Sequence, residues 1–306
     1  MKTISWWHSA SGALLLAGCA TTPAPVEQIK YFSQAFVAVN TVGQPLLDDL
    51  ALSERALGRR NAVARAKKSP DDQPCSSNEA PWALSADPQL GYIDGYCLQH
   101  AGYFANIGDP PATAQLRGGL RVIERYAEVL TTLAEGRNVE QALGQVDALG
   151  QDVGALLALT GSDIAINAAL TALKPLLANV AKQSNAEEAR RLILDGAPTV
   201  DRLIAALRAA VPASFNTLTS GLRLSAGVAA TAAASVKDIE ARRIAVSQYV
   251  VLLDRLQSAW DATVLAVRAP GGARLSDLVA RSAELRADAD AVRRTLAALR
   301  SGVSSP

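Results

Sequence analysis

The sequence predicts an all-α protein: an elongated antiparallel helical bundle with coiled-coil-like heptad packing and one disulfide-closed loop insertion. Aromatic residues make up 5% of the chain, alanine is abundant, and apolar residues do not alternate at period two, which together favour helices over sheets. Apolar residues recur instead at steps of three and four, the spacing of one helix face. Such stripes, sustained over many turns, indicate neighbouring helices that pack nearly antiparallel. A solenoid is the weaker alternative, because no internal repeat of about 34 to 40 residues is evident.

The chain begins with the features of an export signal. Lys2 supplies a positive charge, residues 9–17 form a short apolar segment, and small residues precede Cys19. Because such signals are removed on export, we expect residues 1–18 to be absent from the mature protein. Beyond them, the longest run without a charge, residues 31–47, contains polar residues and a proline and is too short to span a bilayer.

The run Leu16-Ala17-Gly18-Cys19 resembles the lipobox of bacterial lipoproteins. The resemblance implies that Cys19 is acylated, becomes the first residue of the mature chain and holds it to a membrane, with residues 19–25 as a proline-containing tether. In Gram-negative lipoproteins, Ala20 after the acylated cysteine implies release to the inner leaflet of the outer membrane, facing the periplasm. The alternatives are ordinary cleavage after Ala20 and an uncleaved apolar anchor. The resemblance covers only the start of the chain, and we recognise no family in the remainder.

The helical domain is expected over residues 26–306, opening with a helix from about Val26 to Lys68. Its apolar residues follow helical spacing, and it would be about 60 Å long if straight. A kink is expected near Gly43 and Pro45, because proline lacks the N–H that the helix needs.

Residues 69–97 are rich in proline and glycine and are expected to form a structured loop insertion. Cys75 and Cys97 lie in this insertion and, in an oxidising compartment, most simply pair with each other. Such a bridge would add about 3 kcal/mol by restricting the unfolded chain. The alternative is two buried free thiols.

Two helices are predicted after the insertion. Asp109 as a cap and Pro110 in the first turn open a helix that ends near Glu135. Asn138 caps the next helix, which ends near Gly161.

Prolines divide the C-terminal half of the chain. Pro175 is expected to interrupt one helix, and Pro198 and Pro212 are expected to be joints between later ones. One long helix is expected from Pro212 to about Arg268. A last helix carries a heptad stripe over residues 275–299.

Charge and motif content argue against several functions. The chain has 30 Lys and Arg against 29 Asp and Glu, so no net field attracts nucleic acid. His100 is the only histidine outside the signal, and neither metal-ligand spacing nor a phosphate-binding glycine pattern occurs. Cys19 is assigned to lipidation and the other two cysteines to a bridge, which leaves no thiol nucleophile. We therefore predict a non-enzymatic protein with no catalytic residues, metal or cofactor.

Aromatic residues gather in and just after the insertion and are a candidate patch for a partner or ligand. Rings on a disulfide-held loop can stack on sugars or anchor a protein partner. The alternative is a private mini-core that covers one end of the bundle. The candidate residues are Trp82, Tyr92, Tyr96, His100, Tyr103 and Phe104.

A basic stretch at the end of the first helix is a candidate patch for an anionic surface, such as lipid headgroups or an anionic wall polymer. The alternative is that these cations offset the dipole at a helix C-terminus and keep the surface soluble. The candidate residues are Arg55, Arg59, Arg60, Arg65, Lys67 and Lys68.

Two stretches rich in small residues, 153–181 and 224–236, are expected to be tightly packed core. The alternative is a helical hairpin that leaves the bundle and enters a bilayer, as in α-helical pore-forming proteins. Charges divide the first stretch into uncharged pieces too short to span.

Together these observations predict a lipid-anchored periplasmic helical scaffold, spacer or accessory subunit of the cell envelope. Its expected partners are the membrane, through the lipid anchor, and an envelope protein, with no nucleic acid. The alternative functions are a membrane-perturbing helical protein and a binder of glycans or small ligands through the aromatic insertion.

Overall fold

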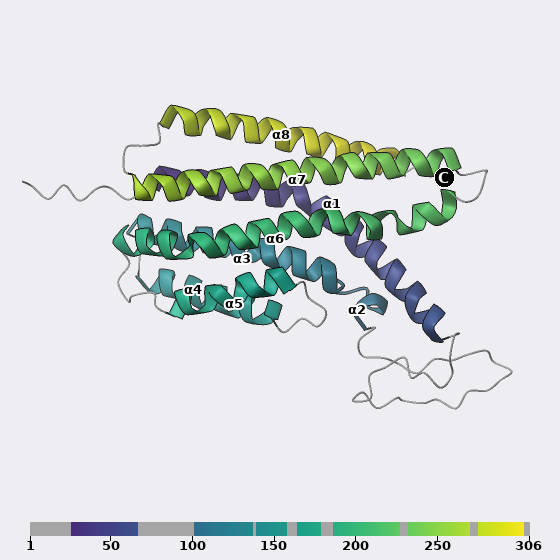
Figure 1. Cartoon of the computed structure of the whole chain (residues 1–306), viewed down its shortest axis with the longest axis horizontal. Coiled ribbons are helices and arrows are strands. Elements are labelled where there is room, and N and C mark those ends of the chain that lie inside the picture. Colours follow the sequence, from purple (N-terminus) through teal and green to yellow (C-terminus); the bar gives the residue numbers. More distant parts are fainter. Residues whose placement is uncertain are drawn as a thin grey trace, which may run out of the picture.

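The computed structural model describes residues 26–66, 101–136, 139–157, 164–178, 186–226, 232–269 and 275–302. Within these ranges the chain forms eight helices and no strands, packed antiparallel, which confirms the all-α prediction (Figure 1). The predicted insertion at 69–97, with the predicted disulfide between Cys75 and Cys97, lies outside them. The helices are α1 (Val26–Ala66), α2 (Ala101–Phe104), α3 (Pro111–Ala134), α4 (Val139–Leu157), α5 (Ile164–Ala178), α6 (Ala186–Ala226), α7 (Ala232–Arg268) and α8 (Leu275–Gly302).

The helices lie along a common axis, with the longest ones innermost (Figure 1). α6 and α7 form an antiparallel hairpin, and α1 packs against both of them and against α3. α8 covers α1 and α7 on one side, while α4 packs on α3 and α5 packs on α6 at the other. α1, α3, α6 and α7 therefore enclose the centre of the molecule.

The bundle has two distinct ends. We call the end at which α1 begins the N-terminal end, and the opposite end, where α1 and α6 finish and α7 starts, the distal end (Figure 1). At the N-terminal end, Lys30 of α1 pairs with Glu135, just after α3, at 3.3 Å. At the distal end, Arg60 of α1 donates a hydrogen bond to Ser220 Oγ of α6 at 3.0 Å.

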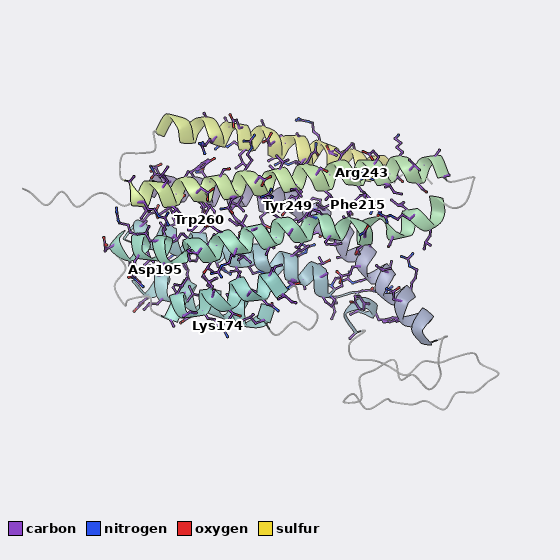
Figure 2. The ribbon with its side chains drawn as sticks, in the orientation of Figure 1. Lys174, Asp195, Phe215, Arg243, Tyr249 and Trp260 are labelled. Atoms are coloured by element: carbon purple, nitrogen blue, oxygen red, sulfur yellow. The ribbon has the colours of Figure 1, made fainter. Side chains whose placement is uncertain are left out.

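Trp260 of α7 is fully buried in the core and lies toward the N-terminal end of the bundle (Figure 2). Its ring lies 5.0 Å from that of Phe32 and 6.0 Å from that of Tyr126, centroid to centroid, in tilted and edge-on arrangements. The Tyr126 hydroxyl donates a hydrogen bond to the Leu192 carbonyl of α6 at 2.6 Å. Aromatic contacts and one buried hydrogen bond thus join all four inner helices.

α1 is one helix that runs through Pro45. Because proline has no N–H, the carbonyl of Thr41 receives no helical hydrogen bond from it, and the helix can bend there. Figure 1 shows α1 lying along α7 over its first half and turning away over its second half, as expected from the sequence. A Cβ at Gly43 would lie 2.4 Å from the Tyr249 hydroxyl, so glycine permits the close approach of α7.

The predicted breaks at Pro175, Pro198 and Pro212 are wrong. Pro175 lies inside α5, and Pro198 and Pro212 lie inside the continuous helix α6. All three prolines are exposed, and so are the residues four positions before them. The carbonyls that lose a helical partner therefore face water, which accounts for the tolerance of proline here.

The predicted single helix from Pro212 to Arg268 is also wrong, because this stretch is divided between α6 and α7. α6 ends at Ala226, and the next residue in the sequence is Gly227, the residue type most common just after a helix C-terminus. In α7, Val246, Leu253, Trp260, Val264 and Val267 are buried, whereas Val236 is 60% exposed.

The other predicted helices agree with the structure to within a few residues. The predicted helices starting near residues 109 and 138 correspond to α3 and α4, and the last one corresponds to α8. In α8 the described part of the heptad stripe is buried: Leu285, Ala289, Val292 and Leu296.

Candidate functional site

The α1–α2 junction at the distal end holds those candidate residues whose side chains the structure describes. They are Arg55, Arg59 and Arg60 of α1 and Tyr103 and Phe104 of α2. The remaining candidates are not assessed by the structure: Cys19, Cys75, Cys97, Trp82, Tyr92, Tyr96, His100, Lys67 and Lys68 lie outside the described residues, and the side chain of Arg65 in α1 is not described. Among the described residues, basic candidates of α1 and aromatic candidates of α2, which are separate in the sequence, therefore lie close together.

Arg59 holds the end of α2 against α1. Its Nε donates to the Tyr103 carbonyl at 2.7 Å, and its Nη2 donates to the Phe104 carbonyl at 3.3 Å and to Asn106 Oδ1 at 3.1 Å. Its guanidinium also lies 5.9 Å from the centre of the Phe104 ring. The charge therefore meets carbonyl oxygens at a helix end, where their partial negative charge gathers. Arg55 makes a similar hydrogen bond to the Gly108 carbonyl.

Tyr103 packs directly onto the backbone of α1 at Gly58. A Cβ at position 58 would lie 2.4 Å from the tyrosine ring, closer than any real contact. Because a rigid ring cannot move aside as a flexible side chain can, glycine is required at position 58 for this packing. Phe104, by contrast, is 49% exposed and Ile107 is 85% exposed.

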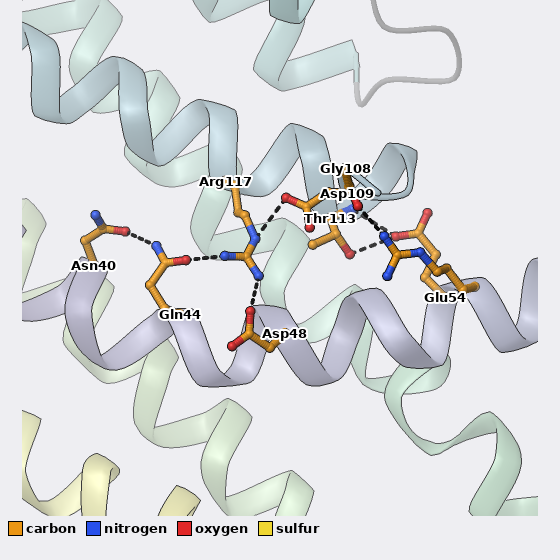
Figure 3. Close-up of polar contacts among 9 residues, drawn as sticks. Asn40, Gln44, Asp48, Glu54, Gly108, Asp109, Thr113 and Arg117 are labelled. Atoms are coloured by element: carbon orange, nitrogen blue, oxygen red, sulfur yellow. Dashed lines mark hydrogen bonds and ion pairs between the residues drawn. The ribbon is translucent and has the colours of Figure 1, made fainter. Parts of the chain in front are cut away.

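Glu54 is the residue that caps α3, although it lies on α1. Glu54 is 7% exposed, and its carboxylate accepts hydrogen bonds from the Ala112 and Thr113 amides and the Thr113 hydroxyl, each at 2.9 Å (Figure 3). The first amides of a helix lack internal partners and carry partial positive charge, so a buried carboxylate is stabilising there. The sequence-based assignment of Asp109 as the cap is wrong. The residue at the cap position before α3 is Pro110, whose side chain has no group that can accept a hydrogen bond from the helix amides.

Asp109 instead joins a polar cluster around Arg117 of α3 (Figure 3). Arg117 Nη2 lies 2.5 Å from Asp48 Oδ1, and its Nε lies 3.0 Å from Asp109 Oδ2. Gln44 accepts a further hydrogen bond from this guanidinium and donates one to Asn40 at 2.6 Å. The cluster ties the middle of α1 to the start of α3, and sequence analysis missed both Glu54 and Arg117.

A cleft of about 310 Å³ opens beside this cluster, between α3 and α4. Arg117, Arg121, Asp109 and Asp152 line it, and Arg121 lies 3.9 Å from Asp152. Since its positive and negative groups balance, the cleft has no strong preference for a charged ligand of either sign.

The distal ends of α6 and α7 carry a second group of arginines. Arg243 and Arg223 lie 5.1 and 5.8 Å from the centre of the Phe215 ring (Figure 2). Arg242 donates to the Leu218 carbonyl at 2.5 Å. Both Arg223 and Arg243 are exposed, so this part of the distal surface is positively charged.

The described residues also bear on membrane and metal chemistry. Among those residues, no helix is long and apolar enough to cross a membrane. The same part of the chain contains no group of three or more histidine, cysteine or acidic side chains placed to hold a metal ion.

Comparison with known proteins gives no relative: no family model, curated protein or solved structure matches this chain.

Proposed function

We propose that the protein is a lipid-anchored helical spacer, or accessory subunit, of the bacterial cell envelope. Cys19 attaches the chain to a membrane, residues 19–25 act as a tether, and the bundle carries a contact surface at its distal end. The residues assigned to contact are those of the α1–α2 junction, with Phe104 and Ile107 outermost.

The observation that carries this proposal is the opposite placement of the two candidate features. The tether joins α1 at Val26, whereas Arg59 and the α1–α2 junction lie near the other end of this 41-residue helix. At about 1.5 Å per residue, α1 corresponds to a length on the order of 60 Å. A close-packed core joins α1 to α3, α6 and α7, which supports a stiff connection between the two ends.

Cell fractionation tests the attachment. We expect the wild-type protein to sediment with membranes, and its N-terminal peptide to carry fatty acids on Cys19 by mass spectrometry. Cys19→Ser should move the protein to the soluble fraction, because its bundle then has no lipid chain. An unmodified peptide beginning at Thr21 would contradict the proposal.

Site-specific photocrosslinking in intact cells tests the contact surface. A photoreactive residue in place of Phe104 should give a reproducible crosslink to one envelope component. Leu265, which is 52% exposed near the N-terminal end, is the matched control position and should not give that product. The same product from both positions, or from Leu265 alone, would contradict a distal contact.

A further inference from the structure

We infer that the distal end of the bundle docks on a membrane surface that contains anionic phospholipids. The inference deepens the proposed function, since it names what the end of the spacer meets. The proposed surface contains residues of α6 and α7 in addition to the basic residues at the end of α1.

The first observation is that positive charge outweighs negative charge among the described residues of the distal end. Over 54–62, 101–108, 214–224 and 232–244, the basic side chains are Arg55, Arg59, Arg60, Arg223, Lys237, Arg242 and Arg243, and the acidic ones are Glu54, Asp238 and Glu240. Glu54 is buried against the first amides of α3, and Glu240 pairs with Arg243 at 3.0 Å. The excess of positive charge at this end contrasts with the near balance of the whole chain.

The second observation is the kind of partner these arginines have. In the part of the chain that is described, Arg60 bonds to the hydroxyl of Ser220, and Arg223 bonds to Asn216 Oδ1 at 3.1 Å. The hydrogen-bond acceptors of Arg55, Arg59 and Arg242 are likewise uncharged, namely backbone carbonyls and the side-chain oxygen of Asn106.

Arginines in the middle of the bundle behave differently. Arg208 pairs with Asp254 at 2.8 Å, and Arg255 pairs with Asp288 at 3.2 Å. Apart from Arg243, the distal arginines therefore make no ion pair with a described carboxylate. Their charge is not offset by a neighbouring acid, which suits them to phosphate oxygens.

The third observation is that exposed apolar side chains accompany the charges. Leu224, next to Arg223, is 65% exposed, and Val236 at the start of α7 is 60% exposed. Phe104 and Ile107 add apolar surface beside Arg59. Arginines beside exposed apolar residues are typical of surfaces that sit at the boundary between headgroups and acyl chains. A soluble anionic polymer would use the charges but gain nothing from Leu224.

Vesicle binding tests the inference without the lipid anchor. The chain from residue 19 with Cys19→Ser keeps every described helix, so a failure of lipidation would not affect this test. We expect it to co-float with vesicles of phosphatidylcholine and phosphatidylglycerol, to bind phosphatidylcholine alone weakly, and to lose binding as salt rises, since salt screens exposed charges.

Two matched triple variants locate the binding surface. Arg60→Gln, Arg223→Gln and Leu224→Ser together remove two exposed arginines and one exposed leucine from the distal end. Arg202→Gln, Arg268→Gln and Leu265→Ser remove the same residue types from exposed positions outside it. Each arginine near an anionic surface raises the binding affinity about fivefold, so the distal triple variant should bind these vesicles at least tenfold more weakly.

The control triple should change binding less than twofold, and both proteins should keep the helical circular dichroism of the parent. Equal weakening by the two triples, or no binding to phosphatidylglycerol vesicles at low salt, would overturn the inference. Leu224→Ser alone should also weaken vesicle binding. If it does not, and polyphosphate binds as tightly as vesicles do, the distal end recognises an anionic polymer instead and the inference fails.

Discussion

Two buried tyrosines in the same core differ in the hydrogen bonding of their hydroxyl groups. Tyr126 and Tyr249 are both 1% exposed, and burial raises the pKa of each phenol well above its usual value. Each points at a glycine, because a Cβ at Gly196 or Gly43 would lie 2.1 or 2.4 Å from the respective hydroxyl. Tyr126 donates to the Leu192 carbonyl, whereas the Tyr249 hydroxyl has no hydrogen-bond partner among the described residues.

The two tyrosines should therefore respond oppositely to loss of the hydroxyl. Tyr126→Phe should lower the free energy of unfolding by about 1 kcal/mol, because it leaves the Leu192 carbonyl without this donor. Tyr249→Phe should leave that free energy unchanged or raise it, since it removes a buried polar atom that the fold does not satisfy. Urea unfolding followed by circular dichroism measures both. Equal losses in the two variants would mean that the Tyr249 hydroxyl is satisfied in solution.

At the scale of the element, the start of α3 depends on a residue far away in sequence. Glu54 is separated from Ala112 by 58 positions and accepts three hydrogen bonds at this helix end, including that from the Thr113 hydroxyl. The contact also fixes the register of α3 against α1, because the first amides of α3 must lie beside a carboxylate that α1 carries.

Glu54→Ala should lower the free energy of unfolding by about 2 kcal/mol, because it strips a buried charged acceptor from two backbone amides. Glu240→Ala is the control: it removes an exposed carboxylate that pairs with Arg243 at 3.0 Å, and it should change the free energy by less than about 0.5 kcal/mol. Chemical denaturation of both variants gives the comparison. A loss at Glu54 no larger than that at Glu240 would show that α3 begins without this cap.

The same elements show what sequence patterns can predict. α1, α3 and α8 were predictable because their signals are local: apolar stripes and, for α3, a proline at the helix start. The cap on α3 was not, because capping rules compare neighbours in sequence and assign Asp109 rather than Glu54. The prolines of α6 misled the prediction, because sequence alone does not tell whether the carbonyl left without a partner faces water.

At the scale of the whole molecule, α8 lies at the edge of the bundle. It packs on α1 and α7 from one side only, and its buried residues are Leu285, Ala289, Val292 and Leu296 among those whose side chains are described. Its ion pairs with Arg255 are exposed and add little. α7, in contrast, lies between α8 and the helices α1 and α6.

Native-state hydrogen exchange should therefore distinguish α8 from the inner helices by the protection of their amides. The amides of α8 should exchange by local opening at a lower free energy than those of α3 and α7, which open only with the whole fold. Mass spectrometry of peptides from 283–298 and from 249–264 makes the comparison, and equal protection of the two would contradict it.

The candidate surface could be predicted only in part, because it is assembled from helices that are far apart in the sequence. Arg55, Arg59 and Arg60 are neighbours along one helix and stand out in the sequence. Arg223 and Arg242 do not, because they join the same end only through the antiparallel return of α6 and α7. A charge cluster assembled from three helices has no signature in any single stretch of sequence.

The contacts that pin Tyr103 and Phe104 to α1 make the α1–α2 junction a natural grafting point. α1 ends at Ala66, and α2, which begins at Ala101, is held against α1 by Arg59 and by the ring of Tyr103 on Gly58. Because these contacts lie outside residues 67–100, we expect them to hold α2 on α1 when the sequence between Ala66 and Ala101 is shortened or exchanged. The bundle would then support different amino-acid sequences between residues 66 and 101 without a change in the packing of its helices.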